Sequence, residues 1–286
     1  MVSLWCKQHS THSLVLARNG CVLVAVAHFV CIFVRNCSLN LIVNIKGKYG
    51  DIVQQNFFAD PEKDFVTIDF KNNEGRYVQV YIDFRLKRKI FQVIALGEMD
   101  RAESSYEAMC FVTELEDEEF ITSDAMSKLR QKNPSAIRVP EDDIGSKSHS
   151  MDHAVMLDAM NATDQNISQL CRDAGKVLFK GSNPKLLLQE NSTREDLDKL
   201  ELAAQDQSGF TKLLKRCKDT SELSAECICR VEVCISWYPC HLKFCQGQDD
   251  NGQPMEYRCG IKTCGKCHDF DFYVGERRHC FWDINS

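Results

Sequence analysis

The chain has 286 residues, of which 44% are apolar and 27% are charged, and its formal net charge is −6. This composition is typical of one large or two small globular domains and is too hydrophobic for a disordered chain. The negative charge, without a basic stripe interleaved with aromatic residues, argues against a nucleic-acid-binding protein.

An apolar segment at residues 21–34, CVLVAVAHFVCIFV, follows Lys7 and Arg18 and precedes Arg35. A basic region before such a segment is typical of a secretory signal, and the segment is shorter than the roughly 20 residues that a membrane span needs. Residues 1–37 are therefore predicted to be a cleaved signal peptide. An uncleaved signal-anchor and a buried core segment are the alternatives, and the chain is expected at a membrane only if the segment is uncleaved.

Three N-glycosylation sequons lie in the middle third of the chain, at Asn161, Asn166 and Asn191. Such sequons are typical of surface segments in secreted proteins. They support secretion independently of hydropathy.

Residues 38–115 predict one sheet of five or six strands, because short apolar runs are separated by turn residues. The clearest hairpin signal is the turn at residues 72–75 before an alternating run. The predicted strands are residues 39–45, 52–58, 65–70, 77–84, 90–96 and 110–115.

Asp83 lies on the strand face opposite Val78, Val80 and Ile82, beside Tyr81. Either that face is solvated and Asp83 is a surface carboxylate, or Asp83 is partly buried with a shifted pKa. We favour the surface interpretation from the sequence.

The next segments predict helices and an exposed loop. A helix of about three turns is predicted from the capping residue Thr122 to Asn133, because Pro134 follows. Residues 136–150 are polar and predict an exposed loop, and residues 151–157 predict a returning strand. Residues 184–216 predict one or two amphipathic helices, broken near residues 208–209.

Cys110 and Cys171 are predicted disulfide partners in an oxidising compartment. Closing so long a loop would stabilise the fold by roughly 4 kcal/mol in the chain-entropy model. Two buried thiols are the alternative.

Ten of the sixteen cysteines lie in residues 217–280. So short a segment cannot bury enough apolar surface alone, so it needs disulfides or a metal. Paired cysteines at short spacing are compatible with zinc, but the signal-like start, the sequons and the even count from Cys110 onward favour disulfides. The predicted disulfide cysteines are Cys110, Cys171, Cys217, Cys227, Cys229, Cys234, Cys240, Cys245, Cys259, Cys264, Cys267 and Cys280.

The sequence predicts no catalytic residue, no metal and no cofactor, because no phosphate loop, dinucleotide fingerprint or Gly-x-Ser-x-Gly motif is present. The adjacent pairs at residues 240–241 and 267–268 are the Cys–His nucleophile candidates, but neighbours in a strand point apart. The aromatic residues near these cysteines are predicted to form a small core packed on the disulfides; they are Trp237, Tyr238 and Phe244. The basic run at residues 85–88 has the form of a convertase site between two predicted strands.

Several motifs resemble known families. The residues Asp83-Phe84, Cys110-Phe111-Val112 and Leu170-Cys171 resemble the shared positions of BRICHOS domains. The runs at residues 110–113, 125–134, 237–240 and 269–274 are similar to the Out at first family, over residues 39–284.

The resemblance implies an α+β fold in three parts. These are a BRICHOS-like antiparallel sheet with helices at residues 38–175, a helical linker at 176–213 and a small cysteine-rich, disulfide-bonded domain at 214–286. It also implies that Cys234 and Cys267 are additions to the family's cysteine pattern, which can pair with each other.

The resemblance does not reveal a molecular activity. Together with the signal-like segment, the sequons and the cysteines, it leads to the hypothesis of a secreted, non-enzymatic glycoprotein of development, which binds extracellular or secretory-pathway protein partners. Binding is expected either through the BRICHOS-like sheet, as a chaperone-like module, or through the rigid cysteine-rich domain. A membrane-anchored BRICHOS proprotein that releases its cysteine-rich domain, and an intracellular zinc-binding regulator, are the alternatives.

Overall fold

In the computed structural model of the chain, the described residues are 41–47, 50–72, 75–96, 106–159, 164–248 and 252–280. They belong to one compact unit, which spans Ser38–Ser286. The predicted signal segment at residues 1–37 and the sequon at Asn161 lie outside the described residues. No helix within the described ranges is long and apolar enough to cross a membrane.

A ten-stranded sheet forms the first layer, in the order β11-β9-β10-β6-β5-β4-β3-β2-β1-β7. Strands β1 to β6 form an antiparallel meander, so the six strands predicted from the sequence are neighbours in one sheet. The bounds are β1 Leu41–Lys46, β2 Ile52–Asp60, β3 Phe65–Lys71, β4 Tyr77–Asp83, β5 Arg88–Leu96, β6 Tyr106–Glu114, β7 Ile137–Arg138, β9 His153–Met156, β10 Lys176–Phe179 and β11 Gln205–Asp206.

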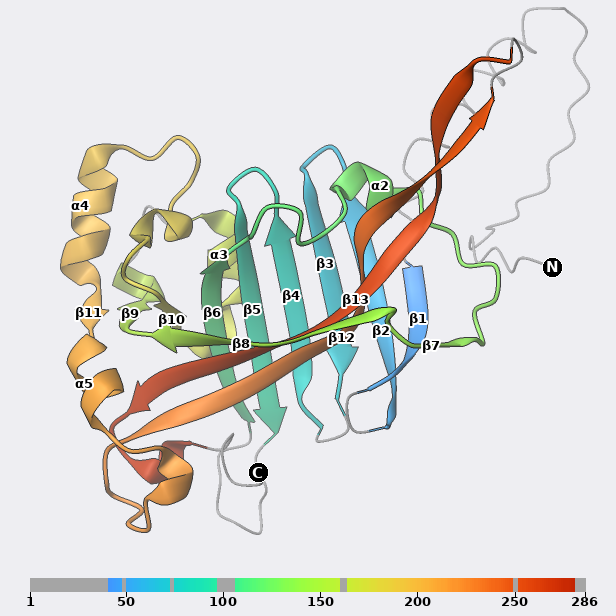
Figure 1. Cartoon of the computed structure of the whole chain (residues 1–286). Helices are drawn as coiled ribbons and strands as arrows, with labels where there is room; N and C mark the ends of the chain where they lie inside the picture. Colours follow the sequence, from blue (N-terminus) through green and yellow to red (C-terminus); the bar gives the residue numbers. More distant parts are fainter. Residues whose placement is uncertain are drawn as a thin grey trace, which may run out of the picture. The chain divides into compact units, whose positions relative to one another are not determined.

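A long hairpin of β12 (Cys227–Gln248) and β13 (Pro254–Val274) crosses one face of this sheet (Figure 1). Strand β8 (Asp142–Met151) pairs in parallel with β13 and completes a three-stranded second sheet. The prediction of a loop at residues 136–150 is therefore wrong. The side chains of β8 are mostly exposed, so its sequence lacks the alternation of apolar residues that marks a half-buried strand. The segment is a strand because its backbone pairs with β13.

The main core lies between the ten-stranded sheet and the hairpin. Phe270 of β13 stacks on Phe111 of β6 at 4.3 Å between ring centroids, and Trp237 of β12 meets the ring of Phe57 edge-on at 5.7 Å. One continuous cluster of buried side chains includes both layers. The regions predicted as a first domain and a cysteine-rich domain thus share this core and the pairing of β8 with β13.

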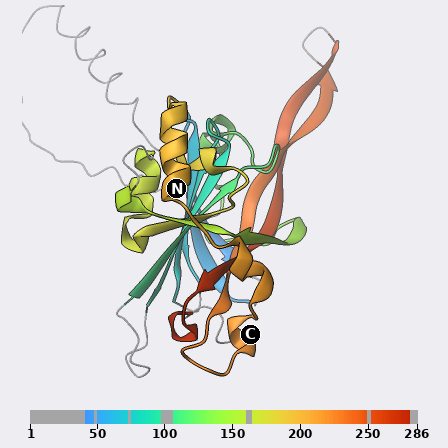
Figure 2. The ribbon, with the colours of Figure 1, turned by 90° about the vertical axis from the view of Figure 1, so that its left-hand side faces the viewer.

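A second core covers the opposite face of the sheet. Tyr81, Ile90 and Val112 point from the strands into a cluster that also contains Ile167 and Leu200. These partners come from α3 (Gln165–Leu170) and α4 (Arg194–Ala203), and Figure 2 shows α3 and the hairpin on opposite sides of the sheet. Strand β5 is buried at nearly every position, because both of its faces are covered.

The short helices differ from the predicted ones in length. Helix α2 (Ser123–Ser127) begins after the predicted cap Thr122 but ends well before Asn133, because the polar run that follows has no apolar face to bury. Ser208 and Gly209 begin α5 (Ser208–Leu213) instead of breaking a helix, since β11 interrupts the segment earlier. The 3₁₀ turns are η3 Leu157–Ala159, η4 Arg172–Ala174, η5 Pro184–Leu187, η6 Cys217–Asp219 and η7 Arg277–His279.

Candidate functional site on the hairpin arm

Six disulfides join the twelve cysteines that the sequence singles out. The predicted Cys110–Cys171 pair is bonded, and the C-terminal segment is disulfide-rich, as predicted. Cys227 and Cys229 reach different partners, and the two additions to the family pattern bond to each other. The C-terminal bridges are Cys217–Cys227, Cys229–Cys280, Cys234–Cys267, Cys240–Cys264 and Cys245–Cys259.

The distal half of the hairpin, residues 241–248 and 254–262, extends past the ends of the sheet strands, and we call it the hairpin arm (Figure 1). It exposes three large side chains: Phe244 is 53% exposed, Met255 46% and Tyr257 47%. The prediction of Phe244 as a core residue is therefore wrong, because the sheet does not lie beneath it. Trp237 and Tyr238, nearer the sheet, are buried as predicted.

A cross-strand disulfide and the packing of Tyr257 on Gly247 restrain the arm. Tyr257 lies opposite Cys245, which is bonded to Cys259, and a register shift follows Lys243. A Cβ atom added at Gly247 would lie 3.0 Å from the ring of Tyr257. The ring thus covers the glycine backbone, and the exposed apolar groups are presented by a covalently closed ladder.

Two ion pairs connect the base of the arm to the start of β8. Lys243 Nζ lies 2.6 Å from Glu141 Oε2, and Lys262 Nζ lies 2.5 Å from Asp142 Oδ2. These side chains are about half exposed, so each pair contributes at most about 1 kcal/mol. They link the arm to the start of β8 and contribute little to the stability of the fold.

A buried ionic cluster fixes the hairpin to the sheet below the arm. Glu119 receives hydrogen bonds from Lys89 of β5 at 2.5 Å and from Lys266 of β13 at 2.9 Å. Lys266 and Lys147 of β8 also pair with Glu116. Burial lowers the pKa of Lys89 to about 8, although the carboxylate of Glu119 opposes this shift. Hydrogen bonds from Lys147 and Lys266 lower the pKa of Glu116 to about 2.

Two histidines lie beside this cluster. His149 of β8 stacks on His268 of β13, with 3.0 Å between His149 Nε2 and His268 Nδ1. Burial, with the nearby lysine charges, lowers the pKa of His149 to about 4 and that of His268 still further. Both rings are therefore neutral at neutral pH. The ionic cluster and the histidines connect β5, β8 and β13, and Lys89, Glu119 and His268 are buried, whereas Lys147 and Glu116 reach the surface.

Sequence reasoning missed this cluster. The predicted strand began at Ile90, whereas β5 begins at Arg88 and includes Lys89. A lysine inside an otherwise apolar strand was the available signal, but its partner Glu119 is 30 residues away in sequence. Nothing in the local pattern connects the two.

Asp83 is 5% exposed, so its interpretation as a surface carboxylate is wrong. It pairs with the fully buried Arg88 at 3.2 Å, and Arg88 also pairs with Asp164 at 2.9 Å. Asp164 caps α3 by accepting from the backbone N–H of Asn166. Because helices cover this face, Asp83 is a buried carboxylate whose partner is the guanidinium of Arg88. The burial of Arg88 also places the last residue of the convertase-like run inside the fold.

The remaining predicted residues lie apart from the arm. Asn166 is half-buried in the first turn of α3, and Asn191 is exposed just before the cap of α4. Two groups of metal-ligating side chains converge among the described residues, but each contains disulfide-bonded sulfurs, which are not the thiolates that bind metals. These groups are Cys217, Cys229 and Cys280, and Glu232, Cys234 and Cys267.

Two family profiles match the chain: "Out at first" over residues 39–183 and "Out at first, C-terminal" over residues 216–284. The Out at first protein of Drosophila virilis is 36% identical over 253 residues, which cover 85% of this chain and 82% of the relative. The Drosophila melanogaster protein is 36% identical over 254 residues, and the chain spans 51% of its length. No solved structure matches the chain. These matches confirm the resemblance read from the sequence: the chain belongs to the Out at first family.

Proposed function

We propose that this chain is a secreted, non-enzymatic glycoprotein that binds an extracellular protein partner through its hairpin arm. The observation that carries the proposal is the exposure of Phe244, Met255 and Tyr257 on a ladder closed by the Cys245–Cys259 bridge. Aromatic side chains and methionine are enriched at protein interfaces. A rigid element loses little conformational entropy on binding, so more of the contact energy becomes affinity.

Secretion is supported by the disulfides and by one sequon. Six disulfides are typical of a protein that folds in an oxidising compartment. Asn191 is exposed and can carry a glycan without disturbing a core. Binding rather than catalysis is supported because Cys240 and Cys267 are both disulfide-bonded, so neither adjacent Cys–His pair offers a thiolate nucleophile.

The arm is a better interface than the sheet. A chaperone-like sheet needs a free face or edge for extended apolar segments. The hairpin covers one face of the central strands and the helices cover the other, and the edge strands β7 and β11 are each 2 residues long. A relationship to BRICHOS domains remains part of the proposal. It is supported by the Cys110–Cys171 bridge and the buried Asp83, which lie in the same half of the sheet.

The test compares two variants for binding to cells that retain the wild-type protein at their surface. In the arm variant, Phe244, Met255 and Tyr257 are all replaced by serine. In the control, Leu202 and Leu213, which are 89% and 85% exposed on α4 and α5, are replaced by serine. We expect the arm variant to bind at least tenfold more weakly, since truncation of a central interface residue costs about 2 kcal/mol, and the control to bind normally.

Mass spectrometry without reduction checks that both variants keep their disulfides, and sequencing of the secreted chain locates its first residue. Equal binding of the arm variant and the wild-type protein would refute the arm as the interface. Failure of the wild-type chain to reach the medium would refute secretion itself.

A further inference from the structure

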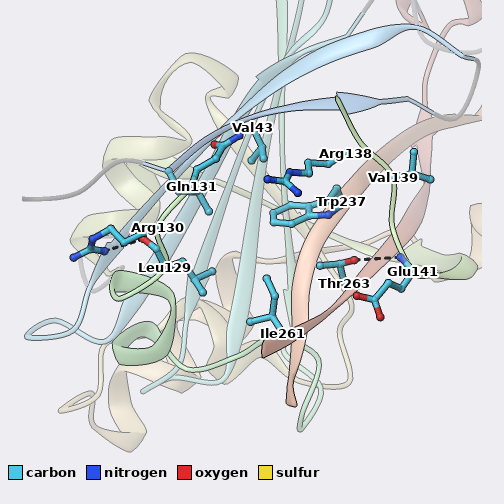
Figure 3. Close-up of a pocket in the computed structure, with 11 residues that line it drawn as sticks. Val43, Leu129, Arg130, Gln131, Arg138, Val139, Glu141, Trp237, Ile261 and Thr263 are labelled. Carbon is cyan, nitrogen blue, oxygen red and sulfur yellow. Dashed lines mark hydrogen bonds between the residues drawn. The ribbon is translucent and has the colours of Figure 1, made fainter. Parts of the chain in front are cut away.

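A cavity of about 290 Å³ lies at the base of the hairpin arm. Val43 of β1 and Leu129, which follows α2, line one side, and Trp237 of β12 and Ile261 of β13 line the other (Figure 3). This volume is at the lower end of the range for small-molecule sites. The cavity therefore suits a small ligand with an apolar body.

Arg138 of β7 brings a guanidinium group to this cavity, beside Trp237 (Figure 3). Its side chain is half-buried, and within the described part of the chain no carboxylate, carbonyl or hydroxyl group accepts a hydrogen bond from it. Arg130, which also lines the cavity, donates instead to the backbone carbonyls of Ser127 and Leu129, each at 2.8 Å. A guanidinium has five N–H donors in a planar fork that matches a carboxylate.

Other polar groups around the cavity take part in hydrogen bonds or ion pairs within the protein. The backbone N–H of Glu141 donates to Thr263 O at 2.9 Å and to Thr263 Oγ1 at 3.1 Å. The carboxylate of Glu141 pairs with Lys243, and the amide of Gln131 donates to the backbone of Asn133. Six of the eleven lining residues are apolar, which provides a surface for a hydrocarbon body beside the guanidinium of Arg138.

We propose that this cavity binds a small amphiphilic carboxylate of the fatty-acid type. The carboxylate pairs with the guanidinium of Arg138, and the hydrocarbon chain lies against Trp237, Leu129 and Ile261. Charge complementarity selects the anionic head group, because a cationic head group would meet the unpaired guanidinium. This inference is independent of the partner of the hairpin arm.

The test is isothermal titration of the purified protein with decanoate, below its micelle concentration. We expect saturable one-to-one binding of decanoate, binding of decanol about tenfold weaker, and no binding of decyltrimethylammonium, because an ionic hydrogen bond to the head group is worth about a factor of ten or more. Arg138→Gln is expected to weaken decanoate binding to the level of decanol and to leave decanol binding unchanged.

Lys132→Gln is the matched control. It removes the same charge from the same segment, but Lys132 is exposed and does not line the cavity, so decanoate binding should be unchanged. If Arg138→Gln does not fold, Val139→Glu takes its place: Val139 is 61% exposed, and a carboxylate there competes for the guanidinium and weakens decanoate binding. The proposal is overturned by an absence of saturable decanoate binding, by equal affinity for decanol, or by wild-type affinity in the variant that folds.

Discussion

The two halves of the β12–β13 hairpin share one backbone ladder and the same kind of cross-strand disulfide, but their surroundings are opposite. In the proximal half, Val231, Ile235 and Phe270 are fully buried against the sheet. In the arm, Phe244 and Tyr257 remain about half exposed. Burial of apolar surface stabilises the first half, whereas the arm depends on its ladder and the Cys245–Cys259 bridge. The proximal half anchors the hairpin on the sheet, and the arm exposes its apolar side chains to solvent.

Phe270→Ala should cause the largest loss of stability in this comparison. Phe270 is fully buried and contacts both Phe91 and Phe111, so its truncation leaves a cavity that costs about 3–5 kcal/mol. The matched change in the arm, Phe244→Ala, should cost at most about 0.5 kcal/mol. Urea unfolding of both variants measures the two values. Similar losses would show that the arm is packed as tightly as the proximal half.

Glu119→Gln should have the next largest effect, because it leaves the buried ammonium group of Lys89 without its carboxylate. Breaking a buried ion pair from one side costs about 3 kcal/mol or more. The control Glu141→Gln removes an exposed partner of Lys243 and should cost less than about 1 kcal/mol. Thermal unfolding at pH 7 compares the two. If the Glu119→Gln and Glu141→Gln variants are equally stable, the ionic cluster does not contribute to holding the hairpin on the sheet.

The meander could be predicted because alternation records which side chains face a core. Val66, Ile68 and Phe70 alternate with more exposed residues in β3, and turn residues separate the strands. Alternation does not reveal what covers the second face. The exposure of Asp83 was therefore predicted wrongly, since its covering helices lie some 80 residues further along the chain.

The candidate site was harder to predict than the sheet. Aromatic residues beside cysteines suggested a small core, and this was correct for Trp237 and Tyr238 but wrong for Phe244. Whether an aromatic residue of the hairpin is buried depends on whether the sheet extends beneath it, and tertiary packing determines where the sheet ends. Strand β8 was missed for a related reason: its partners on β13 lie more than 100 residues away in the chain, and its mostly polar side chains show no apolar alternation.

His149 should make the anchored half sensitive to acid. Its folded pKa of about 4 lies below its ordinary value of 6.5, so the unfolded chain binds a proton first as the pH falls. Stability contributed by the neutral ring is therefore present above pH 6.5 and is lost as the pH falls toward 4. Between pH 6.5 and 5 the free energy of unfolding should fall by about 2 kcal/mol. The pKa of His149 is lowered by burial and by the charges of Lys89, Lys147 and Lys266, and the charge of Glu119 opposes this shift.

Unfolding free energies at pH 7.5, 6 and 5 measure this dependence, and His149→Gln should reduce it. His268 has the same sign of shift, so part of the loss remains in the variant. His279 lies in η7, outside the ionic cluster, and its replacement by glutamine is the control. An identical pH dependence in His149→Gln and the wild-type protein would contradict the buried, neutral state of this ring.

Replacement of Cys245 and Cys259 by serine should have the smallest effect on global stability and the most local one. The bridge closes a loop of 14 residues, for which the chain-entropy model gives about 3 kcal/mol. Because the arm makes few contacts with the core, its opening is a local event, and the global unfolding free energy should change by less than about 1 kcal/mol. Hydrogen exchange should show lost protection at residues 243–248 and 255–260 and unchanged protection at residues 227–235.

The same replacement at Cys229 and Cys280, which are buried in the anchored region, should instead lower global stability by about 2–5 kcal/mol. If both double variants lose global stability equally, the arm unfolds together with the sheet and the two halves of the hairpin are a single cooperative unit.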